Sequence, residues 1–151
     1  MKGLVRLEGF KELEKALSEI GKASTQKAVV RRALKKAAQP MADTAMALAP
    51  RQEGTLQASI AVGTKLSARQ AKLHRRMFKD DKAAVEMFVG AGPLSSAHNQ
   101  EFGNEHHGPQ PFMRPAWDAH AMPTLNRIGN LMWDEIDKQA KRNRKKSGWE
   151  A

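Results

Sequence analysis

The chain has 151 residues, a formal net charge of +10 and no cysteine. This length fits one domain with one core, and the lack of cysteine excludes disulfides, thiolate metal sites and a cysteine nucleophile. No apolar run reaches the roughly 18 residues that a membrane helix needs, and residues 1–10 lack the apolar block of a signal peptide. The composition fits a reducing cytoplasm, and the charge leaves nucleic acid, an acidic protein surface or self-assembly open as partners.

The N-terminal third predicts a short strand and two helices. Residues 2–7 fit a strand, and apolar residues at spacings of three and four predict a helix over residues 10–22. Ser24 or Thr25 is expected to cap a second helix over residues 26–48. Pro40 lies inside that helix and should kink or briefly break it, at a cost of about 3 kcal/mol if unrelieved. The residues expected on its buried side are Val30, Ala33, Leu34, Ala37, Met41, Ala45 and Leu48.

The middle of the chain predicts two strands around a basic helix. Alternating apolar residues predict strands over residues 55–64 and 84–90. Between them, residues 65–82 are strongly basic, and Ser67 can cap a helix that runs through Phe78. Residues 94–103 are ambiguous between a helical turn and a short strand.

The C-terminal third predicts a loop and a long helix. Residues 101–116 contain two glycines and three prolines, which excludes a helix interior, while Phe102, Phe112 and Met113 favour burial and so predict a pinned loop. A 3.6-residue period predicts the last helix over residues 116–141. Its expected buried stripe is Trp117, Ala121, Leu125, Ile128, Met132, Ile136 and Ala140.

These elements predict an α+β fold: a small antiparallel sheet with two N-terminal helices and a long C-terminal helix packed on one face. We expect a single domain over residues 1–141, with residues 65–82 as a basic insertion. The basic tail, residues 142–151, is expected to be disordered.

Several short motifs in order resemble a known family. They are Ala49-Pro50, Gly54-Thr55-Leu56, Ser59-Ile60, Val89-Gly90, Glu101-Phe102-Gly103 and the run Pro109-Gln110-Pro111-Phe112-Met113-Arg114-Pro115-Ala116. Together they resemble the neck or tail-completion proteins of lambda-like long-tailed bacteriophages, the gene-product-ten-like branch of tail components. Asn104 stands where the family usually has threonine, and residues 65–82 are not part of the pattern.

The resemblance implies a structural virion protein and no catalysis or cofactor. Such a protein forms a ring at the head–tail junction, completes the tail and lets it join the filled capsid; it would be present in the host cytoplasm during assembly. Its implied partners are other copies of itself and the adjacent head-closure, tail-terminator or tail-tube proteins. The residues expected to dock on a neighbour are Glu101, Phe102, Gly103, Pro111, Phe112, Arg114 and Pro115.

Catalytic and metal sites are weakly indicated. A metal site could draw on His98, Glu101, Glu105, His106 and His107. Adjacent histidines rarely bind one ion and no helical i, i+4 pair is present, so a polar exposed loop is favoured. Ser95 and Ser96 lack a nucleophile-elbow setting. Trp117 and Trp133 are typical of core or subunit-contact residues rather than of a ligand platform.

The alternative function is a small DNA-binding protein that uses residues 65–82. Basic side chains recur there at spacings of three and four, so a helix would present them together to phosphates. They are Arg69, Lys72, Arg75, Arg76 and Lys79. A solvated face or a patch for an acidic neighbour is the competing interpretation, and only Phe78 is available for stacking on single-stranded bases.

Overall fold

The computed structural model describes residues 9–51, 54–80, 83–92 and 94–148. The strand expected over residues 2–7 lies outside these residues. The described part is mostly helical, with one small antiparallel sheet, so the broad α+β prediction holds. Within it, no helix contains a stretch that is apolar enough to cross a bilayer.

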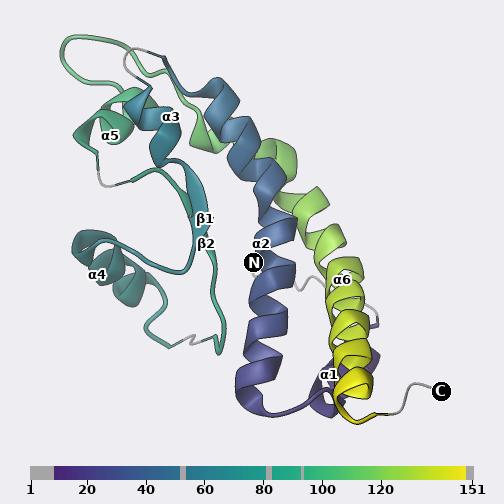
Figure 1. Ribbon diagram of the computed structural model, residues 1–151. Coiled ribbons are helices and arrows are strands. Elements are labelled where there is room, and N and C mark those ends of the chain that lie inside the picture. Colours follow the sequence, from purple (N-terminus) through teal and green to yellow (C-terminus); the bar gives the residue numbers. More distant parts are fainter. Residues whose placement is uncertain (1–8, 52–53, 81–82, 93, 149–151) are drawn as a thin grey trace.

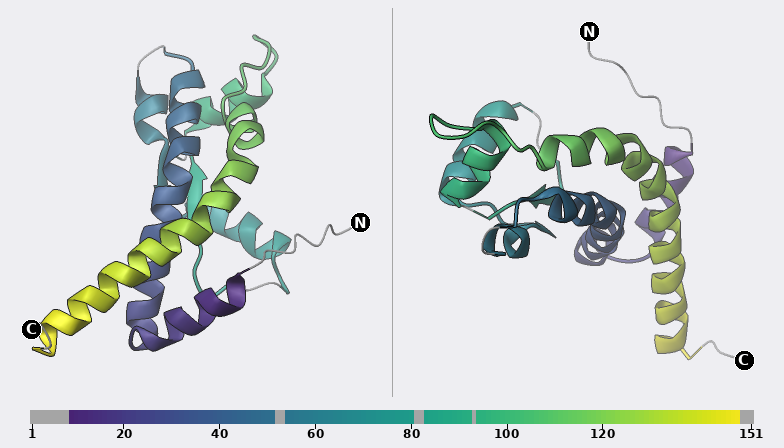
Figure 2. Two further views of the ribbon diagram at one scale, coloured as in Figure 1. Left: turned by 90° about the vertical axis from the view of Figure 1, so that its right-hand side faces the viewer. Right: turned by 90° about the horizontal axis from the view of Figure 1, so that it is seen from above.

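Two long antiparallel helices form the body of the protein. Helix α2 (Ala23–Leu48) runs alongside α6 (Met113–Lys146), and α1 (Phe10–Glu19) packs near the C-terminal end of α6 (Figure 1). Pro40 was expected to kink or briefly break α2; the helix continues through it without a break, and its upper part tilts relative to its lower part in Figure 1. Helix α6 bends in its middle (Figure 2), and Pro123, which has no N–H for the helical ladder, lies within it.

The sheet carries a helical arm beside this body. Strand β1 (Ala61–Gly63) pairs antiparallel with β2 (Phe88–Gly90), with Val62 opposite Val89. Helix α4 (Ala68–Met77) lies between the two strands in the sequence and projects to the side of the sheet away from α2 (Figure 1). We call residues 64–87 the α4 arm. Short helices α3 (Thr55–Ser59) and α5 (Ser95–Phe102) flank the strands at the upper end of the body.

The buried side chains form two clusters along α2. The upper cluster joins α2, α3, β1 and the start of α6 around Phe112, which is only 1% exposed. The lower cluster joins α1, α2 and the second half of α6 around Val29 and Ile136. Alanines at positions such as 33, 37, 42 and 45 are buried on α2, which allows the close approach of neighbouring backbone.

Several element predictions are wrong in instructive ways. Residues 55–59 are helical rather than extended, because Leu56 and Ile60 are both buried at a helical spacing while Ala58 is exposed. The second strand is shorter than residues 84–90. Helix α2 begins after Lys22 without a side-chain cap, so neither Ser24 nor Thr25 caps it.

The expected buried stripes are also partly wrong. Val29 is buried on α2 whereas Leu48 is exposed, and Trp117 is 61% exposed on α6. On α6, Met132 and Ile136 of the expected stripe are buried and Ala121, Leu125 and Ile128 are half-buried, so Trp117 is the stripe residue that departs most from the prediction.

Helix α6 extends into the basic tail as far as Lys146. The Asn143 side-chain amide donates a hydrogen bond of 2.8 Å to the Ile20 carbonyl at the end of α1. This contact ties the end of α6 to a free carbonyl of another helix, which composition alone cannot reveal.

Candidate functional site

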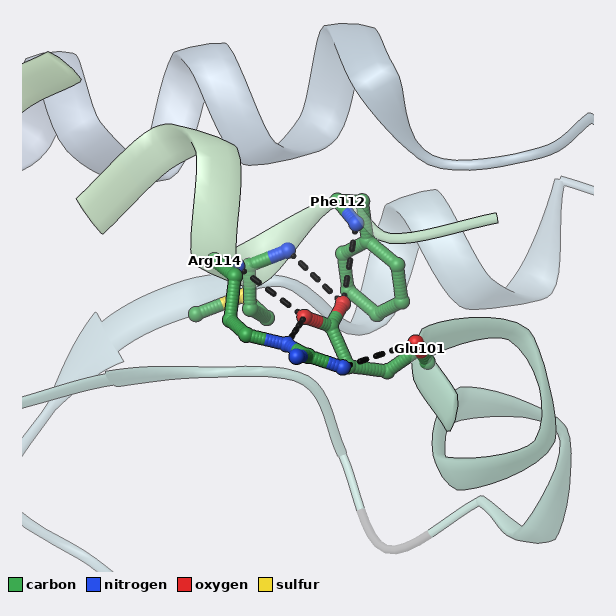
Figure 3. A network of polar contacts seen from close by, with 4 residues as sticks. Glu101, Phe112 and Arg114 are labelled. Carbon is green, nitrogen blue, oxygen red and sulfur yellow. Dashed lines mark hydrogen bonds and ion pairs between the residues drawn. The ribbon is translucent and has the colours of Figure 1, made fainter. Parts of the chain in front are cut away.

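The predicted docking loop is a rigid corner between α5 and α6. Glu101 and Phe102 close α5 rather than belonging to a loop, and Met113 begins α6, so the loop itself covers only residues 103–112. The Glu101 carboxylate accepts hydrogen bonds from the backbone N–H groups of Phe112 (2.8 Å), Met113 (3.0 Å) and Arg114 (3.0 Å) (Figure 3).

This carboxylate serves as the N-terminal cap of α6, supplied by another helix. An α-helix leaves its first N–H groups without internal partners, and its N-terminus favours negative charge. Pro115, which follows Arg114, has no N–H group. The Glu101 carboxylate therefore accepts from the backbone N–H groups of Phe112, Met113 and Arg114, which are the free donors at the start of α6. The Arg114 side chain also contacts Glu101, with Nε 3.3 Å from a carboxylate oxygen.

Burial and hydrogen bonding act on Glu101 in opposite directions. Burial of the carboxyl group by itself would raise the pKa of Glu101. The backbone hydrogen bonds from Met113, Phe112 and Arg114 outweigh burial, so the pKa is lowered from its ordinary value. The group therefore stays ionised at neutral pH and acts as a structural anion.

The loop after α5 folds on itself. Gly103 has a φ of +76°, and a Cβ there would lie 2.9 Å from the Pro109 nitrogen, so the position requires glycine. The Asn104 side-chain oxygen accepts from the backbone N–H groups of His106 and His107. The backbone N–H of Gln110 donates to the carbonyl of Gln100, which closes the base of the loop. The loop was predicted to be pinned by apolar anchors; Phe112 is such an anchor, Phe102 is exposed, and hydrogen bonds together with Gly103 also fix the shape of the loop.

The aromatic residues of the corner have separate roles. Phe112 is buried in the upper cluster, whereas Phe102 is 57% exposed, contrary to its expected burial. The Arg114 guanidinium lies over the Phe102 ring, 4.9 Å from its centroid. Exposed Trp117 follows one helical turn after Arg114. We call Phe102, Arg114 and Trp117 the corner face.

An apolar groove adjoins the corner face. It has a volume of about 1060 Å³ and lies between α4, the two strands and the facing sides of α2 and α6. Arg114 and Trp117 line one end. Its apolar lining includes Met41, Phe78, Met87, Phe88 and Ile128.

The five basic residues predicted as a patch gather on the α4 arm. The helix cap predicted from Ser67 is confirmed, and it forms one half of a capping box: the Ser67 hydroxyl accepts from the Gln70 N–H, and the Gln70 side chain accepts from the Ser67 N–H. No residue of α4 is buried. His74 holds the helix to the body, with its ring 5.2 Å from the Phe88 ring and its Nε2 atom 3.6 Å from Glu86.

The structure does not assemble the metal ligands considered from the sequence. In the described part of the chain, no group of three or more histidine, aspartate or glutamate side chains is placed to hold an ion. His98 packs on Phe102 with ring centroids 4.9 Å apart, and Glu101 is fully engaged as the α6 cap. His106 and His107 lie in the exposed loop.

A second buried carboxylate, Glu135, was not singled out by the sequence. It accepts from Arg32 Nε at 3.0 Å and forms a close ion pair with Lys36, while Lys138 Nζ lies 3.6 Å away. The hydrogen bond from Lys36 is the main cause that lowers the pKa of Glu135 to about 2, against the effect of burial. Arg32 and Lys36 lie 103 and 99 residues away in the sequence, so no local motif indicates their contact with Glu135.

The remaining predicted docking residues take structural positions. Pro111 is exposed just before α6, and Pro115 lies in the first turn of α6, where a missing N–H is tolerated. The structure therefore brings Glu101, Phe102 and Arg114 together at one corner. A docking role for any of them remains a prediction.

Comparison with family models gives one match, over residues 11–103. The matched family is described as Bacteriophage HK97-gp10, putative tail-component. The match includes α1, α2, the sheet with its α4 arm, and α5, and it ends at Gly103 before the proline-rich run. Searches of curated proteins and of solved structures each found no match.

Proposed function

Because the chain belongs to the HK97-gp10 family of phage tail components, we propose that it acts at the head–tail junction of the virion. In this proposal it completes the tail and enables joining to the head through ring-forming contacts between copies. Its work is structural, with no bond made or broken. The family match supports a tail component, and the finer role is argued from the surface of the protein.

The observation that carries the proposal is the corner face. Large aromatic side chains are costly to leave in water, yet Phe102 and Trp117 are each more than half exposed. They flank an arginine, and tryptophan and arginine are enriched among the residues that dominate protein–protein interfaces. An exposed aromatic pair around Arg114 is therefore typical of a contact surface.

The corner also has the rigidity that a contact surface needs. Glu101 fixes the start of α6 against the end of α5, and Phe112 anchors the same segment in the upper cluster. A preformed surface loses little conformational entropy when it binds. The predicted docking role of Phe112 would then be indirect, since its buried ring shapes the corner while Phe102 and Trp117 reach a neighbour.

Ring contacts between copies would cover the corner face and one end of the apolar groove. Specific interfaces bury about 800 Å² on each partner, which exceeds the area of three side chains. The adjoining groove, with its lining of methionine and phenylalanine, supplies further apolar area. We propose that this surface forms the subunit contact on assembly, when other virion proteins hold the copies together.

The test is complementation of a phage that lacks this gene. Trp117→Ala is expected to give separate filled heads and tails by electron microscopy, with titre reduced at least 100-fold. Trp133→Ala removes a less exposed tryptophan, 39% exposed, farther along α6 and serves as the matched control with near-normal titre. Mass spectrometry of purified virions should detect the chain.

Two results would overturn the proposal. Virions that lack the chain would exclude a structural role in the particle. Normal head–tail joining by a Phe102→Ala, Trp117→Ala double variant would exclude the corner face as the contact.

A further inference from the structure

We propose that the outer face of α4 binds the phosphate backbone of duplex DNA without reading its sequence. The proposal goes beyond the tail-component role and does not depend on the corner face. It rests on the side of α4 that carries the cations, on the lack of carboxylates within ion-pair distance of them among the described residues, and on the lack of aromatic side chains between them.

The body-facing side of α4 can be assigned from its contacts. Ser67, Gln70, His74 and Phe78 line the apolar groove, and His74 packs on Phe88 of the adjacent strand. These positions recur every three or four residues and so define one side of the helix.

The cations occupy the opposite side. At about 100° per residue, Arg69, Lys72 and Arg76 lie within roughly 40° of the direction opposite His74. Arg75 lies on one flank. These four side chains are exposed and span roughly 10 Å along the helix. We call Arg69, Lys72, Arg75 and Arg76 the basic face of α4.

Among the residues that the structure describes, the basic face has no ion-pair partner that would explain it. In the ranges that the structure describes, none of its four side chains lies within ion-pair distance of a carboxylate, whereas Arg32, Lys36 and Arg114 all do. Helix stability does not explain it either. Arg69 is in the first turn, where the helix dipole disfavours a cation, although Arg75 and Arg76 in the last turn are favoured.

The character of the face favours nucleic acid over an acidic protein. Protein–protein interfaces have an apolar centre from which charged residues are depleted, whereas protein–DNA interfaces are polar and strongly positive. The positions of α4 that point farthest from the body are Arg69, Lys72 and Arg76, all cations. Of the exposed apolar residues of the helix, Met77 lies on the flank toward the body, and Leu73 lies on the flank opposite Arg75. With no aromatic residue among the cations, base stacking is not available, so the duplex backbone is the fitting ligand.

The physics of counterion release gives a measurable expectation. If four phosphates are neutralised, the logarithm of the binding constant should fall against the logarithm of salt with a slope of about −3.6. Affinity should then fall about 150-fold between 50 and 200 mM salt. The fall should be the same for any duplex sequence, because phosphates carry no base information.

The experiment measures fluorescence anisotropy of two unrelated 24-base-pair duplexes titrated with the full chain over this salt range. The variant R69Q/K72Q/R75Q/R76Q should lose most of the affinity at 50 mM salt, and its slope should flatten. The control K141Q/R142Q/R144Q/K145Q removes the same net charge from the end of α6, which lies apart from α4 in Figures 1 and 2, and should keep the steep slope. Circular dichroism should show both variants folded, because none of the eight side chains is buried.

Three results would overturn the inference. Unchanged binding by the α4 variant would remove its residues from the site. An equal loss in the α6 control would assign binding to net charge rather than to a face. Labelled polyglutamate that binds as tightly as DNA at equal salt would favour an acidic protein partner.

Discussion

Glu101 and Glu135 are both buried glutamates that contact α6 or lie within it, but they are held by different kinds of partner: Glu101 of α5 caps the first turn of α6, and Glu135 lies in its second half. Glu101 accepts from three backbone N–H groups at the start of the helix. Glu135 accepts from two basic side chains of α2 that keep roughly 40–50% of their surface in water (38% for Arg32 and 49% for Lys36). A backbone N–H group in the first turn of a helix cannot rotate into solvent when its acceptor is removed, whereas a half-exposed lysine or arginine side chain can. The same residue type should therefore contribute very differently to stability at the two sites.

The largest expected effect is the loss of the Glu101 cap. Glu101→Ala should lower the free energy of unfolding by about 3–4 kcal/mol, because it leaves one buried and two part-buried backbone N–H groups without an acceptor. Glu135→Ala should cost only about 1 kcal/mol, since Arg32 and Lys36 can return to solvent. Urea unfolding of both variants at pH 7 measures the two losses.

Hydrogen exchange locates the effect of each change. In Glu101→Ala, exchange should rise first at Met113 and Arg114, whose N–H groups lose their acceptor. Equal losses of stability in the two variants would contradict the distinction between backbone and side-chain partners.

The N-terminal caps of α4 and α6 show what the sequence could and could not predict. The capping box of α4 was predictable because Ser67 and Gln70 are three residues apart and each satisfies the other. The cap of α6 was not, because the acceptor precedes its donors by 11–13 residues across a proline-rich loop. A useful signal would have been a helix start that lacks a local Ser, Thr, Asp or Asn cap.

The motif pattern located the candidate site better than it assigned the roles within it. Glu101, Phe102 and Arg114 do meet at one corner. Residue type, however, does not predict which of these side chains is buried: the charged Glu101 is buried and the apolar Phe102 is exposed. Burial depends on which helices and strands pack together, whereas the sequence gives only the order and spacing of the short motifs along the chain.

Acid should remove the ion pairs of Glu135 over a defined range of pH. Its folded pKa of about 2 lies below the ordinary value of 4.5, so its contribution is fully present above pH 4.5 and is lost as the pH falls toward 2. The shift alone corresponds to about 3 kcal/mol, but solvent screens the half-exposed cations and the contribution is closer to about 1 kcal/mol. The pKa of Glu101 is lowered too, so its contribution changes with pH in the same direction.

The variant Glu135→Gln isolates the part of the pH-dependent stability that comes from Glu135. The difference in unfolding free energy between the wild type and this variant should shrink steadily from pH 5 to pH 2, as measured by urea titration at each pH. Parallel stability curves for the two proteins would show that Glu135 has an ordinary pKa in the folded state.

A second comparison sets a glycine of the corner against a glycine of the helical body. Gly103→Ala should cost about 2 kcal/mol, because alanine must adopt a positive φ and its Cβ meets backbone atoms of residues 107–109 at 2.9–3.1 Å. Gly129→Ala should instead stabilise the protein by about 0.5–1 kcal/mol, since a Cβ there meets nothing within 4 Å and alanine favours helix. Thermal unfolding of both variants measures the two shifts, which should have opposite signs. A loss of stability at Gly129 would mean that the bend of α6 needs glycine, and tolerance at Gly103 would mean that the corner is less rigid than its hydrogen bonds imply.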